Sequence, residues 1–364
     1  MRLLALDIGG LTQDILLLDT SQVVENCVKM VMPSPTVTLA NKIVATTKAK
    51  RSLFLTGVNM GGGPSKRALI NHVEAGLAAY ATTEAAATFD DDVGEVTKWG
   101  VRIIGEGEMP QNEDVERIET RDLNLAAIEK TLMAFDVTPH LDGIAVAVFD
   151  HGAAPAGVSD RLFRFQYLRQ ATKLRRELIA FAYLADEIPS LLTRMKAVAQ
   201  SVDKHMPLLV MDTSIAAVLG SLEDREVACH THKLVINVGN FHTLAFHLQH
   251  DSLLGFLEHH TRRLTREKLE DLVVRLVKGK LSHEEVYEDG GHGCLILESR
   301  KDVPFVSVTG PQRALMSGSN LMPYFAAPYG DMMLTGCFGL VRAFALRVET
   351  WGTEIQAALN KSLS

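Results

Sequence analysis

The first residues of the chain constrain its fold more than any other segment. Residues 3–6 are apolar and stop at Asp7, and a second apolar run covers residues 15–18. Gly9 and Gly10 lie between the runs, so the pattern predicts two β-strands joined by a tight turn. Because neither glycine has a Cβ atom, backbone N–H groups of the turn can approach an anion closely. Both an ordinary hairpin that opens a sheet and a phosphate-binding hairpin fit this pattern.

Polar side chains around the turn favour the second interpretation. Thr12 and Gln13 add hydrogen-bond donors. Asp7, at the end of the first predicted strand, has the hard oxygen ligands that Mg²⁺ prefers, either directly or through water.

The length and composition indicate a folded protein of two lobes. A single hydrophobic core rarely serves 364 residues, and we place the lobes at 1–205, with insertions, and 206–364. Hydrophobic residues make up 47% and charged residues 22%, as is usual for soluble globular proteins. The net charge of −7 gives no broad electrostatic reason to bind nucleic acid or an anionic membrane. We predict no membrane span and no signal peptide, and therefore a cytoplasmic protein.

The first half of the chain has a β-β-β-α order. Residues 23–32 are the third predicted strand, residues 38–50 a helix and residues 53–56 a buried strand. A glycine-rich loop at 57–63 follows and leads into a second helix at about 64–79. Its spacing is not that of a Walker A motif. The loop and the basic residues after it, Lys66 and Arg67, fit either an anion site at a helix N-terminus or a solvated turn.

Residues from about 101 to 122 are polar with weak periodicity, and we interpret them as surface excursions. Residues 123–135 predict a helix, and residues 143–149 a short apolar strand. Asp150 and His151 follow this strand, either as an acid–base pair in a cleft or as a capped strand end.

The second half repeats the pattern of the first. Long helical patterns fill 169–204, and a strand returns at 207–211. Residues 233–238 and 243–248 then predict two strands around the turn residues Gly239 and Asn240. Two glycine-bearing hairpins, one in each lobe, suggest an internal structural duplication.

The order of these segments resembles the actin-like ATPase superfamily, which includes sugar kinases, heat-shock chaperones and actin. Residues 3–19 match its first phosphate segment, and 234–248 match the second in layout. Residues 211–220 resemble its connecting segment and 304–311 its adenosine segment, and the stretch 323–339 resembles its closing helix. The resemblance implies an α/β fold of two actin-like, ribonuclease H-like lobes that close on ATP and Mg²⁺.

The resemblance also implies roles for individual residues. Asp7 would face Mg²⁺, and Asp212 would hold a metal-bound water, although Asp is also a favoured helix N-cap. These two residues and Asp150 are the predicted catalytic carboxylates. The remaining predicted nucleotide contacts are Gly9, Gly10 and Thr12 in the first clamp, Gly239, Asn240 and Thr243 in the second, and Thr309 and Gly310 near the ribose or adenine.

More narrowly, the phrases at 61–64, 88–91, 150–152, 160–165 and 237–243 resemble an uncharacterised prokaryotic family whose members carry the label of a pyruvate formate-lyase activating enzyme. Radical activases of that kind need three closely spaced thiolates for an iron–sulfur cluster. The four cysteines, at 27, 229, 294 and 337, are far apart in the sequence. We therefore reject radical chemistry and interpret the cysteines as buried thiols.

One departure from the superfamily pattern makes ATP hydrolysis a weaker prediction than ATP binding. Many relatives have a carboxylate in the second phosphate segment where this chain has Asn237, and an amide cannot act as a general base. Asp212, Asp150 or His242 remain candidates for that role. Our first hypothesis is an ATP-dependent phosphotransferase or ATPase whose small acidic substrate meets Arg161 and Arg164. These arginines also fit a salt-bridged loop.

Two other functions stay open. One is a nucleotide switch, without catalysis, that acts on a partner protein, and the other is a site for a different phosphorylated ligand. The histidines raise a separate question. His230 and His232 alternate on a strand-like segment, with His242, His247 and His250 downstream, but no acidic or Cys ligand completes a recognisable metal-binding spacing. His259 and His260 look like a surface pair.

Overall fold

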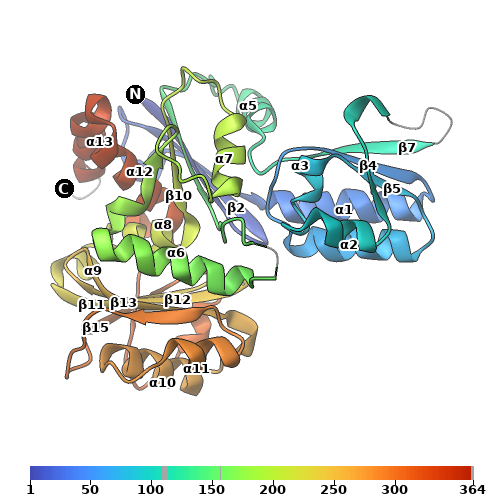
Figure 1. The fold of residues 1–364 in the computed structure, drawn as a ribbon. Helices are drawn as coiled ribbons and strands as arrows, with labels where there is room; N and C mark the ends of the chain where they lie inside the picture. The colour runs from blue at the N-terminus through green and yellow to red at the C-terminus, as the bar shows by residue number, and fades with distance from the viewer. Residues whose placement is uncertain (109–113, 156, 362–364) are drawn as a thin grey trace.

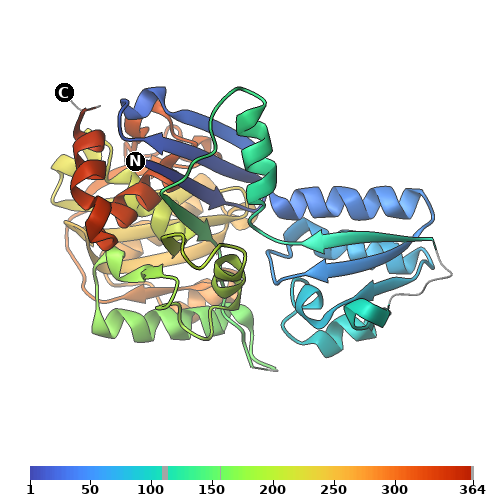
Figure 2. The ribbon, with the colours of Figure 1, turned by 90° about the horizontal axis from the view of Figure 1, so that it is seen from above.

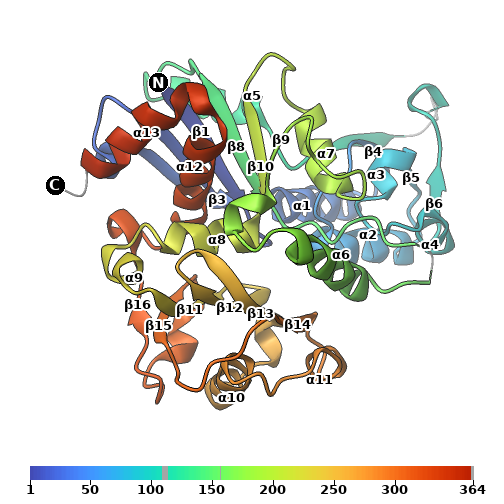
Figure 3. The ribbon, with the colours of Figure 1, turned by 60° about the vertical axis from the view of Figure 1, so that its left-hand side comes forward.

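The computed structural model describes residues 1–108, 114–155 and 157–361. Two six-stranded sheets form two stacked lobes, and a smaller third sheet projects to one side (Figure 1). The helices α8 and α12 lie between the two large sheets, where Figure 3 shows them crossing.

The first large sheet has the strand order β3-β2-β1-β8-β10-β9. Strand β1 pairs antiparallel with β2 and parallel with β8, which pairs parallel with β10. Successive side chains of β1 point to opposite faces of the sheet, and both sets are buried because helices cover each face. The strands are β1 (Arg2–Ile8), β2 (Thr12–Asp19), β3 (Val28–Pro33), β8 (Gly143–Val148), β9 (Ala182–Leu184) and β10 (Leu208–Asp212).

The second large sheet repeats this plan, with the order β14-β13-β12-β11-β15-β16. Its first strand in the sequence, β11, again pairs antiparallel with the next strand and parallel with β15. The strands are β11 (His232–Val238), β12 (His242–Gln249), β13 (Ser252–His260), β14 (Gly293–Ile296), β15 (Phe305–Thr309) and β16 (Tyr324–Phe325).

Each large sheet begins with three antiparallel strands, β1 to β3 or β11 to β13, and has parallel strands beside its first strand. The antiparallel strands β9 and β14 lie at the outer edges of the two sheets. This duplicated order is that of the two ribonuclease H-like lobes of actin-like ATPases, and the predicted α/β fold class is confirmed. The predicted division at residue 205 differs from the sheets in one respect. Strand β10 lies beyond that boundary yet belongs to the first sheet, because it hydrogen-bonds to β8.

Helices α8 (Thr213–Ser221) and α12 (Thr335–Arg347) cross closely between the sheets. A Cβ atom on Gly220 would lie 1.7 Å from the carbonyl oxygen of Thr335, and one on Gly339 would lie 1.9 Å from that of Ala216. Only glycine permits this crossing. The other helices of the two lobes are α5 (Leu125–Met133), α6 (Asp160–Leu174), α7 (Thr193–Gln200), α9 (Arg225–Cys229), α10 (Arg266–Val277), α11 (His283–Glu288) and α13 (Glu349–Lys361).

A third sheet, of order β6-β5-β4-β7, is inserted into the first lobe between β3 and β8. Figure 2 shows this insertion as a separate module at the side of the first lobe. All its strand pairs are parallel, and α1 and α2 pack together beside it. Its elements are α1 (Pro35–Lys48), β4 (Ser52–Gly57), α2 (Gly63–Glu74), β5 (Ala79–Ala81), α3 (Thr83–Ala86), α4 (Val93–Lys98), β6 (Val101–Ile103) and β7 (Val115–Thr120).

The interpretation of residues 101–122 as surface excursions was therefore wrong. They supply both edge strands of the inserted sheet, although residues 109–113 lie outside the described residues. Edge strands alternate weakly between polar and apolar residues, so the pattern of β7 carried little signal. Among the described residues, no helix has the length and apolar character to cross a membrane.

Candidate functional site

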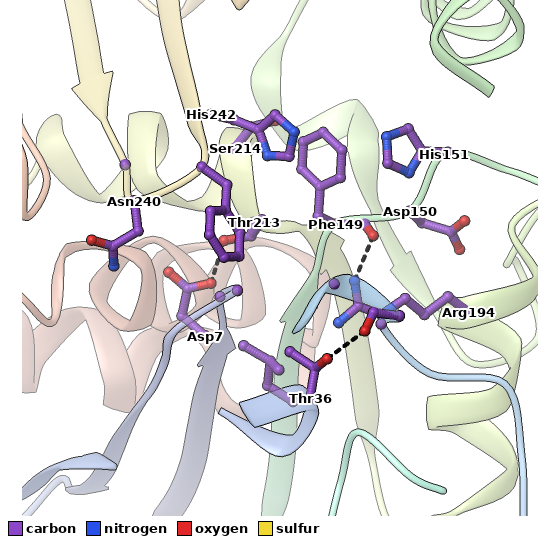
Figure 4. A pocket seen from close by; sticks show the side chains of 18 of the residues that line it. Asp7, Thr36, Phe149, Asp150, His151, Arg194, Thr213, Ser214, Asn240 and His242 are labelled. Atoms are coloured by element: carbon purple, nitrogen blue, oxygen red, sulfur yellow. Dashed lines mark hydrogen bonds between the residues drawn. The ribbon is translucent and has the colours of Figure 1, made fainter. Parts of the chain in front are cut away.

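A cavity of ≈ 450 Å³ lies where the two lobes and the insertion meet. Both predicted hairpins line it, together with the first residues of α8 and α12 and the glycine-rich loop of the insertion. Figure 4 shows side chains from both hairpins and from the start of α8 around it. The sequence related the two hairpins only through the superfamily resemblance, whereas in the structure both line one cavity.

The two hairpin turns share one backbone hydrogen bond at equivalent positions. The N–H of Gly9 donates to the carbonyl oxygen of Thr12, and the N–H of Gly239 donates to that of His242, both at 2.9 Å. A Cβ atom on Gly239 would lie 2.7 Å from the same acceptor oxygen. A Cβ atom on Gly10 would lie 2.1 Å from the ring of Phe241, so the tips of the hairpins touch. The predicted duplication thus extends to the turns that face the cavity.

The side chain of Asp7 lies beside the first turns of both central helices, α8 and α12. Thr213, the first residue of α8, donates its hydroxyl hydrogen to Asp7 Oδ1. A Cβ atom on Gly336, in the first turn of α12, would lie 1.9 Å from Asp7 Oδ2. The positive ends of two helix dipoles therefore face this carboxylate and the adjoining cavity. Burial, followed by the charge of Asp212, nevertheless raises the pKa of Asp7 to about 7.

Asp14 is a second cavity carboxylate, which the sequence analysis missed. It pairs with Asp7 across β1 and β2, and directly opposed residues of antiparallel strands share one face of the sheet. Its Oδ1 atom is buried without a hydrogen-bond partner among the described residues. Burial and then the charge of Asp7 raise its pKa to about 8. An acidic residue within the buried pattern of β2 was the available signal.

These two carboxylates fit Mg²⁺. The orphaned oxygen of Asp14 and the carboxylate of Asp7 are hard ligands at one wall of the cavity, and a cation there would compensate the charge that burial now disfavours.

Asp212 is engaged within the protein. Arg164 donates to its Oδ2 at 2.7 Å and to its Oδ1 at 3.2 Å, and the N–H of Ser214 donates to Oδ1 at 3.0 Å as a helix cap. Asp212 does not line the cavity, although Thr213 and Ser214 beside it do. Its role as a metal ligand stays a prediction, with Arg164 competing for its oxygens.

The suggested anion site at Arg161 and Arg164 is contradicted. Arg164 is buried and also donates to Glu258 Oε2 at 3.0 Å and to the carbonyl oxygen of Asp150 at 2.8 Å. Arg161 donates to the carbonyl oxygen of Gly291 at 2.5 Å and covers a tyrosine ring. All three nitrogens of Arg164 therefore donate to protein groups, and neither arginine lines the cavity.

Asp150 lines the cavity, but both oxygens of its carboxylate accept hydrogen bonds from backbone N–H groups. The N–H of Gly152 donates to Oδ1 at 2.8 Å and the N–H of Met195 to Oδ2 at 2.9 Å. Burial raises its pKa. These bonds match a capped strand end, and the catalytic role of Asp150 is not tested by them.

Most predicted nucleotide contacts of the second lobe reach the cavity. Gly239, Asn240, Thr309 and Gly310 line it, as does Asn237. The exception is Thr243, which is fully buried outside the cavity lining and bonds to the hydroxyl of Thr261 at 3.0 Å.

The glycine-rich loop of the insertion also reaches the cavity, with Lys66 on its helix. Lys66 forms an ion pair with Asp90 at 3.1 Å, whereas Arg67 is exposed outside the lining. Only Lys66, of the two predicted basic residues, therefore faces the cavity. Arg194, which sequence reasoning missed, lies at the same wall and donates to the carbonyl oxygen of Phe149 at 2.7 Å (Figure 4).

The histidines divide into two places. His232 Nε2 lies 2.7 Å from His247 Nε2 on neighbouring strands, away from the cavity lining. His242 instead stacks on Phe149 at the cavity, with a ring-centroid distance of 4.5 Å. The prediction that His259 and His260 form a surface pair was wrong. His259 is fully buried, and the ring of His260 lies near that of His242.

The family described as "Putative pyruvate format-lyase activating enzyme (DUF1786)" matches residues 60–315, more than half of the chain. The chain belongs to this family. Among the described residues, which include all four cysteines, no three thiols lie together, and every cysteine is free. The described residues therefore do not provide the three thiolates that the iron–sulfur cluster of such an activating enzyme would need.

Three solved structures are similar in outline. An activator of the 2-hydroxyisocaproyl-CoA dehydratase from Clostridium difficile with bound ADPNP has 10% identity, a TM-score of 0.35, and coverage of 97% of this chain and 98% of that one. The ethanolamine utilization protein EutJ from Carboxydothermus hydrogenoformans has 10% identity, a TM-score of 0.36, and coverage of 93% and 89%. A sugar kinase from Cytophaga hutchinsonii has 10% identity, a TM-score of 0.25, and coverage of 70% and 49%.

These TM-scores are low, and the fold assignment rests on the duplicated strand order instead. No match was found among curated proteins.

Proposed function

We propose that this protein binds ATP with Mg²⁺ in the cavity between its lobes. The observation that carries the proposal is the convergence of two equivalent hairpin turns and two helix N-termini on one cavity. Backbone N–H groups at such turns and helix ends favour phosphate oxygens. The cavity volume of ≈ 450 Å³ is also suitable for a ligand of this size, since such pockets span roughly 300–1,000 Å³.

Each part of the ligand has candidate contacts. Gly9, Gly10 and Thr12 would receive phosphate oxygens from one side, and Gly239 and Asn240 from the other. Thr309 and Gly310 lie on the wall where the superfamily resemblance puts the ribose or adenine. Asp7 and Asp14 would hold Mg²⁺, which neutralises phosphate charge when bound.

Binding is better supported than phosphoryl transfer. Of the three predicted catalytic carboxylates, Asp150 lines the cavity but accepts from two backbone N–H groups, and Asp212 accepts from Arg164. Asp7 lines the cavity and accepts from the hydroxyl of Thr213. Asn237 cannot accept a proton as a general base. A nucleotide-dependent switch that acts on a partner protein is therefore the second candidate function, and the glycine crossing of α8 and α12 is the contact about which the lobes would move.

Isothermal titration with ATP in Mg²⁺ tests the proposal on nucleotide-free wild-type protein, Asp7→Asn and the control Asp19→Asn. Asp19 ends the same strand pair far from the cavity, so its variant should bind as the wild type does. We expect binding in the wild type and its loss in Asp7→Asn. No binding in the wild type would refute the nucleotide proposal, and unchanged binding in Asp7→Asn would refute the role of Asp7.

Phosphate release from ATP then separates the two candidate functions. A switch binds ATP without appreciable release, whereas an ATPase releases phosphate in proportion to bound enzyme.

A further inference from the structure

Three neighbouring strands of the second lobe bring three histidines together beside the cavity. His242 begins β12 and His260 ends β13, and these two residues are direct partners in the antiparallel register. His292 immediately precedes β14, and its N–H donates to the carbonyl oxygen of Glu258 at 2.9 Å. Because sheet hydrogen bonds fix all three backbones, the side chains meet without a flexible loop between them.

The rings are close enough to share one ion. Their centroids are 5.1 Å apart for His242 and His260, 4.9 Å for His242 and His292, and 4.9 Å for His260 and His292. One ring nitrogen of each lies within 4.8 Å of the others. Tetrahedral ligands at zinc distances are about 3.4 Å apart, so small side-chain rotations suffice to close the site.

A buried carboxylate lies beside one of the three rings. Glu258 Oε1 lies 3.4 Å from His292 Nδ1, and neither atom has a hydrogen-bond partner among the described residues. A metal-bound imidazole commonly directs its other ring nitrogen to a carboxylate. With Nδ1 beside Glu258, His292 has Nε2 as its other ring nitrogen, which lies 3.1 Å from Nε2 of His151, so a metal ion at Nε2 would replace this contact.

Glu258 also accepts from an arginine, and this bond leaves its Oε1 atom on the side of His292. Arg164 donates to the second oxygen of Glu258 at 3.0 Å.

We propose that His242, His260 and His292 bind a first-row transition-metal dication of the zinc class. Imidazole nitrogens select such ions over Mg²⁺ and Ca²⁺, which prefer oxygen. Three imidazoles leave a coordination position for water, as in catalytic rather than structural zinc sites. His242 lines the same cavity as Asp7 and Asp14, but the three histidines share no ligand with the proposed Mg²⁺ site, so metal binding to them does not require nucleotide. His242 also closes the second hairpin turn, so the ion would brace the phosphate-facing loop.

Titration of chelator-treated, nucleotide-free protein with Co²⁺ tests the site, followed by competition with Zn²⁺. We expect one equivalent of Co²⁺ with visible d–d absorption that Zn²⁺ abolishes, and a rise in melting temperature with Zn²⁺. His260→Asn should lose the absorption band while remaining folded, because His260 is only partly buried. Glu258→Gln should weaken binding by roughly 10- to 100-fold, as expected for a residue that positions a ligand.

Two controls make the result specific. His205→Asn changes an exposed histidine outside the cluster and should leave binding unchanged. Cys229→Ser removes a ligand from the group of Glu226, Cys229 and His230, the second cluster of potential metal ligands in the described part of the chain. No stoichiometric Co²⁺ binding in the wild type, or binding lost in Cys229→Ser and kept in His260→Asn, would overturn the proposal. Since no nucleotide is present, its failure is distinct from failure of the ATP site.

Discussion

Replacing Asp14 by Asn should stabilise the nucleotide-free protein at alkaline pH. Burial and the charge of Asp7 raise the pKa of Asp14 from 3.8 to about 8 in the folded state. Between these values the folded protein holds a proton that the unfolded chain has released. The free energy of unfolding therefore falls with rising pH, by up to about 1.4 kcal/mol per pH unit from this group. An asparagine side chain does not titrate, so the free energy of unfolding of the variant lacks this pH dependence.

The size of the effect follows from two opposed terms. A rise of about four pKa units costs at most about 5–6 kcal/mol at pH 8. Asn keeps the shape but adds a buried N–H₂ without an acceptor, which costs about 1–3 kcal/mol. We expect a net gain of about 2–4 kcal/mol at pH 8, and no gain or a small loss near pH 5.

Urea unfolding of Mg²⁺-free protein at pH 5, 6.5 and 8 measures this difference. Asp19→Asn is the matched control on the same strand, because the Ser21 hydroxyl is the first cause that lowers the pKa of Asp19. A group with a lowered pKa stabilises the fold above its ordinary pKa, and this contribution disappears only as the pH falls through the folded-state value. Asp19→Asn should therefore gain nothing between pH 5 and 8. A difference between wild type and Asp14→Asn that is flat over this range would refute the reasoning.

Two further variants probe the contacts around the cavity. Gly336→Ala puts a Cβ atom 1.9 Å from Asp7 Oδ2 and should lower ATP affinity at least about tenfold by displacing that carboxylate, as measured by titration calorimetry. Gly107→Ala, which meets no atom within 4 Å, is its control, and equal affinities would contradict the role of this contact. Arg164→Met leaves Asp212 and Glu258 buried without their cation and should lower the free energy of unfolding by about 3–5 kcal/mol in urea. A loss below about 1 kcal/mol would show that these carboxylates relax without it.

The sequence alone determined the hairpins, because their signals are local. Gly9 and Gly239 lie at turns whose geometry a Cβ atom would disturb, and the apolar runs beside them are the paired strands. The repeated order of such segments was also enough to predict two lobes of one fold class. Insertions in the first lobe were predicted, and so were a helix, a strand and a second helix that belong to this one, but its sheet was not, since the edge strand β7 alternates too weakly to reveal it.

Only the tertiary structure decided which side chains meet. Strand register set Asp14 against Asp7, and the neighbouring strands β12, β13 and β14 gathered His242, His260 and His292 from distant positions. Helix α6 carried Arg164 to two buried carboxylates rather than to a substrate. Such neighbours arise from non-local strand pairing and helix packing, whereas a sequence pattern reports only which residues one element presents on each face.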